Sequence, residues 1–315
     1  MLFAPTLEMI ETKELSKQYG RVQALDRLSV SIAAGEILGF LGPNGAGKST
    51  ALKILSGYLP PSSGTAAVNG LSLLSNSLEA RSLVGYLPEN FVAPSELFVA
   101  EYLTYRAGLK GVKPAERKAE VLRVMKLVGL EHRAHQRFDA LSKGYKQRLG
   151  VADSLLGDPP ILILDEPFSG LDPLQRQEFR QILRRLREAN KAIVFSSHVL
   201  PEVEDLANRV LIIHHGKTRV TSDVKELLDS HDEVQIVAEG EHDLNLEAIQ
   251  NCKLCKDAQA VADNTFTIKV ALSQRAECLH QLAEARVCVT SFAPTRRDLE
   301  SVFAEFVNSV PGDNI

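Results

Sequence analysis

The sequence predicts an α/β fold in which a largely parallel sheet carries the functional loops, followed by a smaller α+β domain. Short aliphatic runs such as residues 37–41 and 161–164 have the length and composition of buried strands, and segments with helical periodicity follow them. This alternation ends near residue 225, after which shorter strands and helices succeed one another. A chain of 315 residues can hold one large and one smaller domain, which we place at residues 1–225 and 226–315.

The composition narrows the class of protein. Hydrophobic residues make up 44% of the chain and charged residues 24%, which is usual for globular proteins. The net charge of -4 argues against a general affinity for nucleic acid, which needs a basic surface. No apolar run approaches the ~18 residues of a membrane-spanning helix, and residues 1–11 lack the features of a secretion signal. We therefore expect a protein of the cytosol.

The first functional element is a glycine-rich loop between a predicted strand and a predicted helix. Residues 42–49 fit the phosphate-loop pattern G-x-x-x-x-G-K-[ST], and the inner glycines let backbone N–H groups converge on phosphate oxygens. Lys48 then contacts the β- and γ-phosphates, and the Ser49 hydroxyl binds Mg²⁺. The residues expected to bind the nucleotide here are Gly42, Pro43, Asn44, Gly45, Ala46, Gly47, Lys48, Ser49 and Thr50.

The second functional element is a pair of carboxylates after the aliphatic run at residues 161–164. We expect Asp165 to hold Mg²⁺ and Glu166 to face the water that attacks the γ-phosphate. Adjacent residues of a strand point to opposite faces, so the two acids can take different roles only where the strand ends.

These motifs together resemble the nucleotide-binding subunit of an ATP-binding-cassette (ABC) transporter, over about residues 10–225. The resemblance implies an ATPase of the P-loop NTPase class that uses ATP and Mg²⁺. Its fold would have a RecA-like core, an antiparallel β subdomain and a helical subdomain at about residues 91–155. By the same resemblance, Tyr19 stacks on adenine, Asp172 is the acid of the loop at residues 169–173, and His198 senses the γ-phosphate. His198 lies just beyond a predicted strand, where open α/β sheets place ligands.

Residues 141–145, with the sequence LSKGY, resemble the family's signature motif. In that family the signature caps the ATP held by a second cassette, so the implied partner is a second copy of this chain, packed head to tail. We expect Ser142, Lys143, Gly144 and Tyr145 to approach the partner's nucleotide at the start of a helix. Lys143 and Tyr145 replace the usual glycine and glutamine, and Lys143 either adds charge near the phosphates or faces solvent.

A second departure from the family pattern is Glu89, where many members have a glutamine that touches Mg²⁺. A carboxylate can still bind this cation. Residues 89–105 are expected to form the groove for an integral-membrane permease, with an inert helical face as the alternative. Both departures resemble the type-2 exporter subgroup of drug and antibiotic efflux, gliding-motility and copper-site-assembly systems. An importer ATPase and a soluble ABC ATPase are the alternatives, and a transporter subunit would lie on the cytoplasmic face of the membrane.

The C-terminal residues predict the element order β-α-β-β-α-β of a ferredoxin-like α+β domain, closed by a helix at residues 296–310. This accessory domain shows no catalytic constellation, and a role in dimer stability or in modulating activity stays open. Cys252 and Cys255 form a C-x-x-C pair, but no second pair follows at metal-binding spacing. We therefore interpret the cysteines at 252, 255, 278 and 288 as ordinary reduced residues.

Overall fold

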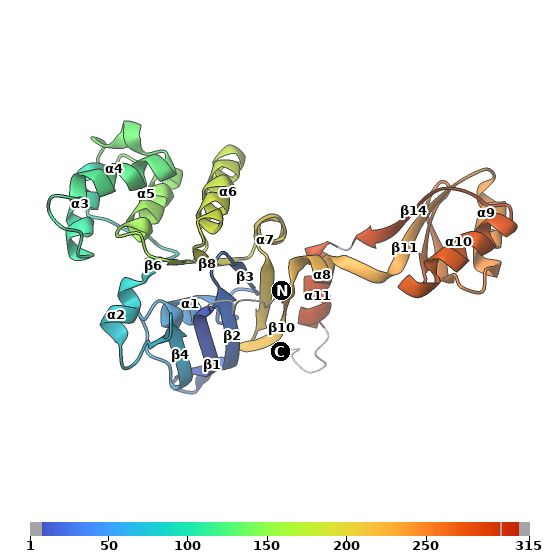
Figure 1. Cartoon of the computed structure of the whole chain (residues 1–315), viewed down its shortest axis with the longest axis horizontal. Helices are drawn as coiled ribbons and strands as arrows, with labels where there is room; N and C mark the ends of the chain where they lie inside the picture. The colour runs from blue at the N-terminus through green and yellow to red at the C-terminus, as the bar shows by residue number, and fades with distance from the viewer. Residues whose placement is uncertain (1–7, 297, 309–315) are drawn as a thin grey trace, which may run out of the picture. The chain divides into compact units, whose positions relative to one another are not determined.

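The computed structural model describes residues 8–296 and 298–308 (Figure 1). Most of the opening segment and residues 309–310 of the last predicted helix therefore lie outside the described part. The described residues form two compact units, one that ends at Asp223 and one that runs from Val224 to Asn308. Each unit is described by itself.

The first unit is built around a six-stranded sheet in the order β10-β9-β3-β8-β7-β6. Its strands are β3 (Ile37–Leu41), β6 (Val84–Leu87), β7 (Ile161–Leu164), β8 (Ala192–Ser197), β9 (Arg209–His214) and β10 (Lys217–Asp223). All run parallel except β10, which pairs antiparallel with β9. Every residue of β3, β7 and β8 is buried, as expected of aliphatic strands covered on both faces. Their carboxyl ends meet at one edge of the sheet.

A four-stranded antiparallel sheet packs against this core. It has the order β2-β1-β4-β5, with β1 (Glu8–Tyr19), β2 (Val22–Ala33), β4 (Ser63–Val68) and β5 (Leu71–Ser72). One hydrophobic cluster joins both sheets and helix α1 (Lys48–Leu55), and it includes Leu15, Leu28, Phe40, Leu52 and Val194. This packing fixes the loop between β3 and α1 from both sides.

Three helices form the predicted helical region, α3 (Val99–Leu109), α4 (Arg117–Val128) and α5 (Lys143–Leu155), which lie together in Figure 1. Arg106 of α3 holds buried Asp153 of α5 with two hydrogen bonds, from Nε to Oδ1 at 2.9 Å and from Nη2 to Oδ2 at 3.0 Å. A planar guanidinium that binds both oxygens sets orientation as well as distance. The pair therefore fixes the orientation of α5, whose first turn carries the signature residues.

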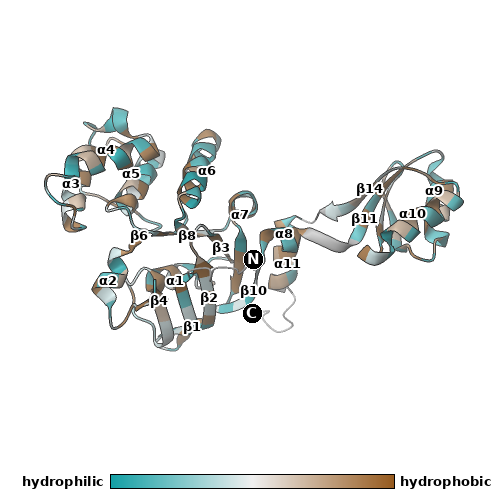
Figure 2. Cartoon of the chain, in the orientation of Figure 1, coloured by the Kyte–Doolittle hydropathy of each residue, from teal (hydrophilic) through white to brown (hydrophobic). Residues whose placement is uncertain are grey.

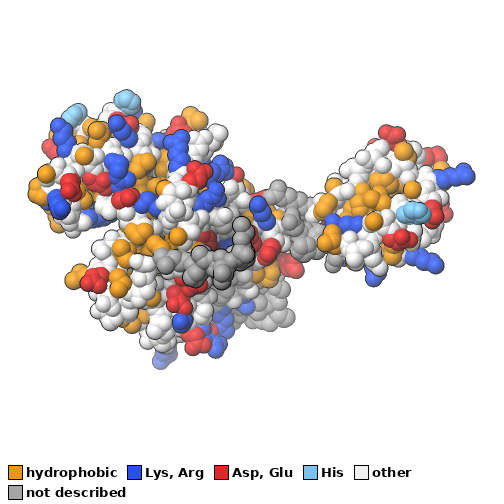
Figure 3. Space-filling model, viewed as in Figure 1, with side chains coloured by type: hydrophobic (Ala, Val, Ile, Leu, Met, Phe, Trp, Pro, Cys, Tyr) orange, Lys and Arg blue, Asp and Glu red, His pale blue; other side chains and the backbone are white. Residues whose placement is uncertain are grey.

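The remaining helices of this unit are α2 (Ser77–Ser82), α6 (Pro173–Glu188) and α7 (Leu200–Leu206). Helix α6 is amphipathic, with Phe179, Ile182, Leu183 and Leu186 buried, and Figure 2 shows brown and teal turns along it. Acidic and basic side chains are interspersed on the face seen in Figure 3. No helix among residues 8–296 and 298–308 has both the length and the hydropathy needed to cross a membrane.

The second unit has the predicted order of elements. They are α8 (Val224–Leu228), β11 (Asp229–Glu239), α9 (His242–Asn251), β12 (Lys256–Ala262), β13 (Thr265–Lys269), α10 (Arg275–Glu284), β14 (Cys288–Arg296) and α11 (Leu299–Asn308). The strands form one antiparallel sheet in the order β12-β13-β11-β14. A separate hydrophobic core, which includes Ile236, Ile249, Phe266 and Leu282, lies within this unit.

We expect Phe266→Ala to destabilise the second unit by about 3 to 5 kcal/mol, because Phe266 is fully buried and its removal leaves a cavity. Chemical denaturation measures the change, and Leu272→Ala is the matched control because Leu272 is 65% exposed. ATP binding by the first unit should be the same in both variants. If Phe266→Ala had the same denaturation midpoint as the parent, in denaturant concentration, this account of the core would be contradicted.

Candidate nucleotide and catalytic site

The phosphate loop is held tightly against the neighbouring strand. A Cβ atom added at Gly42 would lie 2.3 Å from the Ile213 carbonyl oxygen of β9, so only glycine fits there. Gly47, the residue before α1, has a φ of 108°, which a side chain rarely allows. The first N–H groups of a helix have no partner inside it. Because Gly47 leads directly into α1, these donors face the loop and form a site for an anion.

Lys48 lies inside this loop. Its Nζ donates to the carbonyl oxygens of Gly42 at 2.6 Å and Pro43 at 3.3 Å, and the side chain is buried. Burial lowers the pKa of Lys48, while the nearby carboxylates of Glu166, Asp165 and Glu89 raise it. The ammonium group therefore sits where phosphate oxygens could replace the loop carbonyls as its acceptors.

Asp165 joins the end of β7 to the start of α1. Its Oδ1 accepts hydrogen bonds from Ser49 Oγ at 3.2 Å and from Ser196 Oγ at 2.7 Å. The side chain is 1% exposed, yet its Oδ2 is buried without a hydrogen-bond partner. Buried polar atoms normally have partners, and carboxylate and hydroxyl oxygens are the ligands that Mg²⁺ prefers. Ser49 and Asp165 therefore fit a magnesium site.

Glu166 takes a different direction from Asp165 because the strand ends before it. Strand β7 stops at Leu164, and Glu166 has a φ of 49°, in the left-handed region that non-glycine residues rarely adopt. Its Oε2 lies 2.8 Å from His198 Nδ1, and the carboxylate accepts this hydrogen bond. The Glu166 side chain is 12% exposed and that of His198 is 60% exposed. An acid oriented by a histidine at an open edge is a suitable general base.

The sequence-predicted residues Lys48, Ser49, Asp165, Glu166 and His198 thus come together at one sheet edge, and we call them the catalytic cluster. Two others lie at element ends. Tyr19 is the last residue of β1 and is 47% exposed, with the Lys17 ammonium 5.4 Å from its ring centroid. Glu89 is exposed, beyond the end of β6.

The signature residues contact the beginning of α6 within this chain. Ser142 is the N-cap residue of α5 and is exposed, and Lys143 packs its side chain against Gly170. A Cβ atom added at Gly144 would lie 2.2 Å from Gln175 Oε1. The amide of Gln175, a neighbour that the local sequence does not reveal, therefore leaves no room for a side chain at Gly144 unless it moves.

Two further predicted residues have partners in the chain. The ring of Tyr145 has the Arg133 guanidinium 4.7 Å from its centroid, a cation–π contact. Asp172 is the N-cap of α6, where its Oδ1 accepts from the N–H of Gln175 at 2.8 Å. Both contacts orient the loops that carry the predicted nucleotide-binding residues.

Sequence reasoning missed Ser196. Its hydroxyl donates to Asp165 Oδ1 and accepts from the backbone N–H of Glu166 at 2.8 Å, so one side chain holds both acids. The available signal was a serine near the end of the buried strand that precedes His198. This serine can be assigned to the site only when the strand register is known. Leu164 pairs with Phe195, so the next residues, Asp165 and Ser196, lie beside each other.

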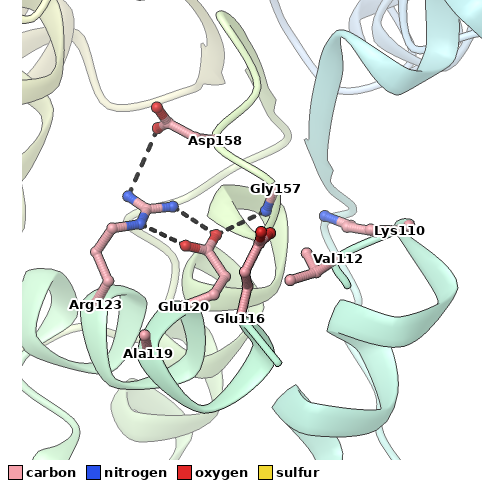
Figure 4. A pocket seen from close by; sticks show the side chains of 9 residues that line it. Lys110, Val112, Glu116, Ala119, Glu120, Arg123, Gly157 and Asp158 are labelled. Carbon is pink, nitrogen blue, oxygen red and sulfur yellow. Dashed lines mark hydrogen bonds and ion pairs between the residues drawn. The ribbon is translucent and has the colours of Figure 1, made fainter. Parts of the chain in front are cut away.

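A cavity of about 480 Å³ lies elsewhere in the first unit (Figure 4). Its lining includes Lys110, Glu116, Glu120, Arg123 and Asp158, and Arg123 binds Glu120 with two hydrogen bonds of 2.7 Å. None of the catalytic cluster lines it. The catalytic cluster therefore lies apart from this cavity.

We expect Gly42→Ala to weaken ATP binding by roughly tenfold or more, equivalent to about 1.4 kcal/mol, because the new methyl group would push the loop away from Ile213. Gly111→Ala is the matched control. Gly111 lies outside the phosphate loop, and a Cβ there would meet nothing within 4 Å, although its φ of 81°, unlike the backbone of Gly42, is itself unfavourable for alanine. Titration with a fluorescent ATP analogue compares the two, and parent-like affinity of Gly42→Ala would contradict the tight packing of the loop.

Comparison with known proteins identifies the family. A family profile described as "ABC transporter" matches residues 25–169. An uncharacterized ABC transporter ATP-binding protein of Synechocystis sp. is 37% identical over 241 residues, which cover 74% of this chain and 68% of that protein. The bacitracin transport ATP-binding protein BcrA of Bacillus licheniformis is 39% identical over 210 residues, 66% of this chain and 68% of that protein.

A solved structure described as "Dimeric Structure of MJ0796, a Bacterial ABC Transporter Cassette" matches with a TM-score of 0.63 and 25% identity, over 69% of this chain and 99% of that chain. These similarities confirm the family and the cassette fold that the motifs predict. The chain belongs to the ABC transporter ATP-binding proteins, the family of ATP-hydrolysing transporter cassettes.

Proposed function

We propose that this chain drives a separate membrane permease by hydrolysing ATP with Mg²⁺, and that the transporter is an exporter. The observation that carries the proposal is the catalytic cluster. A phosphate-loop lysine, a buried carboxylate with an unpartnered oxygen, and a second carboxylate hydrogen-bonded to a histidine share one sheet edge.

The proposed chemistry assigns one task to each residue. The loop N–H groups and Lys48 bind and orient the phosphates, and they oppose the negative charge of the transferred group. Ser49 and Asp165 Oδ2 would hold Mg²⁺, with Glu89 as a further ligand, and the ion would supply positive charge to offset that of the phosphates. Glu166 accepts the proton of the attacking water, and its hydrogen bond to His198 fixes the direction of the carboxylate.

We propose that a second copy completes each site. Cassettes of this family dimerise, and the similar solved structure is described as dimeric. In this proposal Ser142, Lys143, Gly144 and Tyr145 approach the partner's ATP, with Tyr19 on the adenine and Asp172 at the dimer interface. Support comes from the exposed Ser142 at the start of α5, where the N-terminal N–H groups favour an anion.

The permease and the direction of transport are also proposals. The relative BcrA is named for bacitracin transport, and the LSKGY and Glu89 variants resemble exporter ATPases. Residues 89–105, the proposed permease groove, expose Val92 at 79%, Phe98 at 39% and Tyr105 at 60%. These exposed apolar side chains are available for contact with a permease, since a contiguous patch of such residues marks an interaction site. In this proposal the chain works on the cytoplasmic face of the membrane, without a nucleic-acid partner.

We also propose the two-domain organisation, with a boundary near residue 225 and a ferredoxin-like accessory domain after it. The support is the break between compact units after Asp223 and, in the second unit, the four-stranded antiparallel sheet with α9 and α10 in the connections between its strands.

Co-expression tests the proposal as a whole. The tagged chain should co-purify with a permease encoded beside it, and Mg²⁺-dependent ATP hydrolysis should depend on Lys48 in the complex. An adjacent membrane protein without a periplasmic binding protein supports export, whereas such a binding protein would favour an importer. Hydrolysis without any membrane partner, together with ribosome or DNA association, would support a soluble ABC ATPase instead.

A further inference from the structure

Three of the four cysteines converge in the second unit. Cys252 follows α9, Cys255 precedes β12, and Cys278 lies within α10. Their sulfur atoms all lie within 4.8 Å of one another, and those of Cys255 and Cys278 are 3.3 Å apart. The C-x-x-C pair therefore has a third sulfur partner, which comes from a helix and not from a second pair in the sequence.

The surroundings hold these side chains in place. Cys255 and Cys278 are buried in the core that contains Ile249 and Leu282, while Cys252 is partly buried. The N–H of Cys255 donates to the carbonyl of Cys252 at 3.1 Å, which closes the turn between them. A single buried cysteine packs as a small hydrophobic residue, but three sulfurs that face one another from two segments form a set of donor atoms.

We propose that Cys252, Cys255 and Cys278 form a binding site for one thiophilic metal ion of the class of Zn²⁺ and Cu⁺. Bonds of about 2.3 Å to sulfur put the sulfurs of a trigonal or tetrahedral site about 3.8 to 4.0 Å apart. The Cys255–Cys278 separation of 3.3 Å is somewhat shorter than this value, and the other two separations are at most 4.8 Å. Small side-chain shifts bring all three within bonding distance of one ion, and soft thiolate ligands select ions of this class.

The site also has a supporting residue and a route for the ion. In the thiol form Cys252 Sγ donates to Gln281 Oε1 at 3.5 Å, which places the amide of Gln281, one turn of α10 beyond Cys278, beside the outermost sulfur. Once that thiol loses its proton, the amide N–H of Gln281 is the group that can donate to the thiolate and orient it. Cys252, Lys253 and Gln281 line a cavity of about 520 Å³, from which an ion or a fourth ligand such as water can reach the sulfurs. No fourth His, Cys, Asp or Glu ligand atom joins the three sulfurs within the described ranges 8–296 and 298–308.

Binding follows a defined proton balance. Each thiol gives its proton to solvent as its sulfur bonds the metal, so three protons leave for one ion and no oxidant is needed. Affinity should therefore rise with pH. Zn²⁺ with three thiolates leaves one net negative charge, and the ammonium of Lys253 beside the cavity partly offsets it.

The test uses the full chain, stripped of metal and kept reduced without oxygen. We titrate it separately with Zn²⁺ and with Cu⁺ against chromophoric chelators, and we expect one ion per chain for at least one of the metals. Co²⁺ serves as a spectroscopic probe and should give thiolate-to-metal charge-transfer absorption. Bound metal should also protect Cys252, Cys255 and Cys278 from alkylation, while exposed Cys288 reacts as the internal reference.

Matched variants locate the site. Cys278→Ser and Cys252→Ser should each lower the affinity by roughly 10- to 100-fold or more, the loss that even a supporting residue of a metal site can cause, and Cys288→Ser should bind like the parent. Cys252 is partly buried, so its variant keeps the test informative if Cys278→Ser unfolds. The proposal is overturned if the folded parent binds neither metal, if Cys252→Ser binds as tightly as the parent, or if the isolated chain carries a Cys255–Cys278 disulfide.

Discussion

Replacing Glu166 by glutamine is expected to preserve ATP binding and to lower the rate of hydrolysis by roughly 10² to 10⁴-fold, the usual contribution of a general base. Glutamine has the shape of glutamate, and its amide oxygen can still accept from His198 Nδ1, which lies 2.8 Å from the native carboxylate. The loop, Lys48 and Asp165 are unchanged, so the nucleotide should bind normally. The amide cannot take a proton from water, and only the chemical step should fail.

The measurement is steady-state ATP hydrolysis together with equilibrium ATP binding, on the chain alone and with the proposed permease. Glu188→Gln is the matched control, because Glu188 is an exposed acid at the end of α6. Near-normal turnover of Glu166→Gln would reject Glu166 as the base, even if every other part of the site is correct.

The second large effect is expected for Ser142→Arg, which should abolish hydrolysis while a single chain still binds ATP. Ser142 is exposed at the N-terminus of α5 and lies outside the catalytic cluster. If the signature caps the partner's nucleotide, a long cationic side chain at its first position blocks closure of the dimer. The chain's own phosphate loop, with Gly42 and Lys48 in contact, is untouched.

For this variant, ATP binding by the single chain and ATP-dependent dimerisation are measured separately, so that loss of dimer closure can be told from loss of ATP binding. We expect Glu166→Gln to form a dimer with ATP, and the double variant with Ser142→Arg to stay monomeric. Ser273→Arg, at an exposed position of the second unit, is the control for the added charge. Full turnover of Ser142→Arg would show that the signature does not act on the partner's ATP.

The parts of the site that the sequence predicts are those carried by contiguous residues. Gly42 to Ser49 combine strand, loop and helix in one stretch, and Asp165 and Glu166 follow an aliphatic strand directly. The sequence also predicts that the strand ends before the two acids. In the structure β7 stops at Leu164, and Glu166 has a positive φ that no regular strand allows. Local chemistry decides these features, so one sequence is enough to predict them.

The features that escaped prediction depend on which segments lie side by side. Ser196 reaches Asp165 only because β8 lies between β3 and β7, an order that the chain does not follow. Gln175 meets Gly144 through the packing of α6 against α5. Cys278 joins Cys252 and Cys255 because α10 packs against the turn that holds them. No spacing rule within one segment could indicate these neighbours.

The hydroxyl of Ser196 gives the two acids a common anchor. The same oxygen donates to Asp165 and accepts from the Glu166 backbone, so loss of this hydroxyl would disturb the placement of both acids at once. His198 follows two residues later, directly after the end of β8. Ser196 therefore links the positions of the two carboxylates that we propose as the metal ligand and the general base, so a movement of this serine would be passed to both of them.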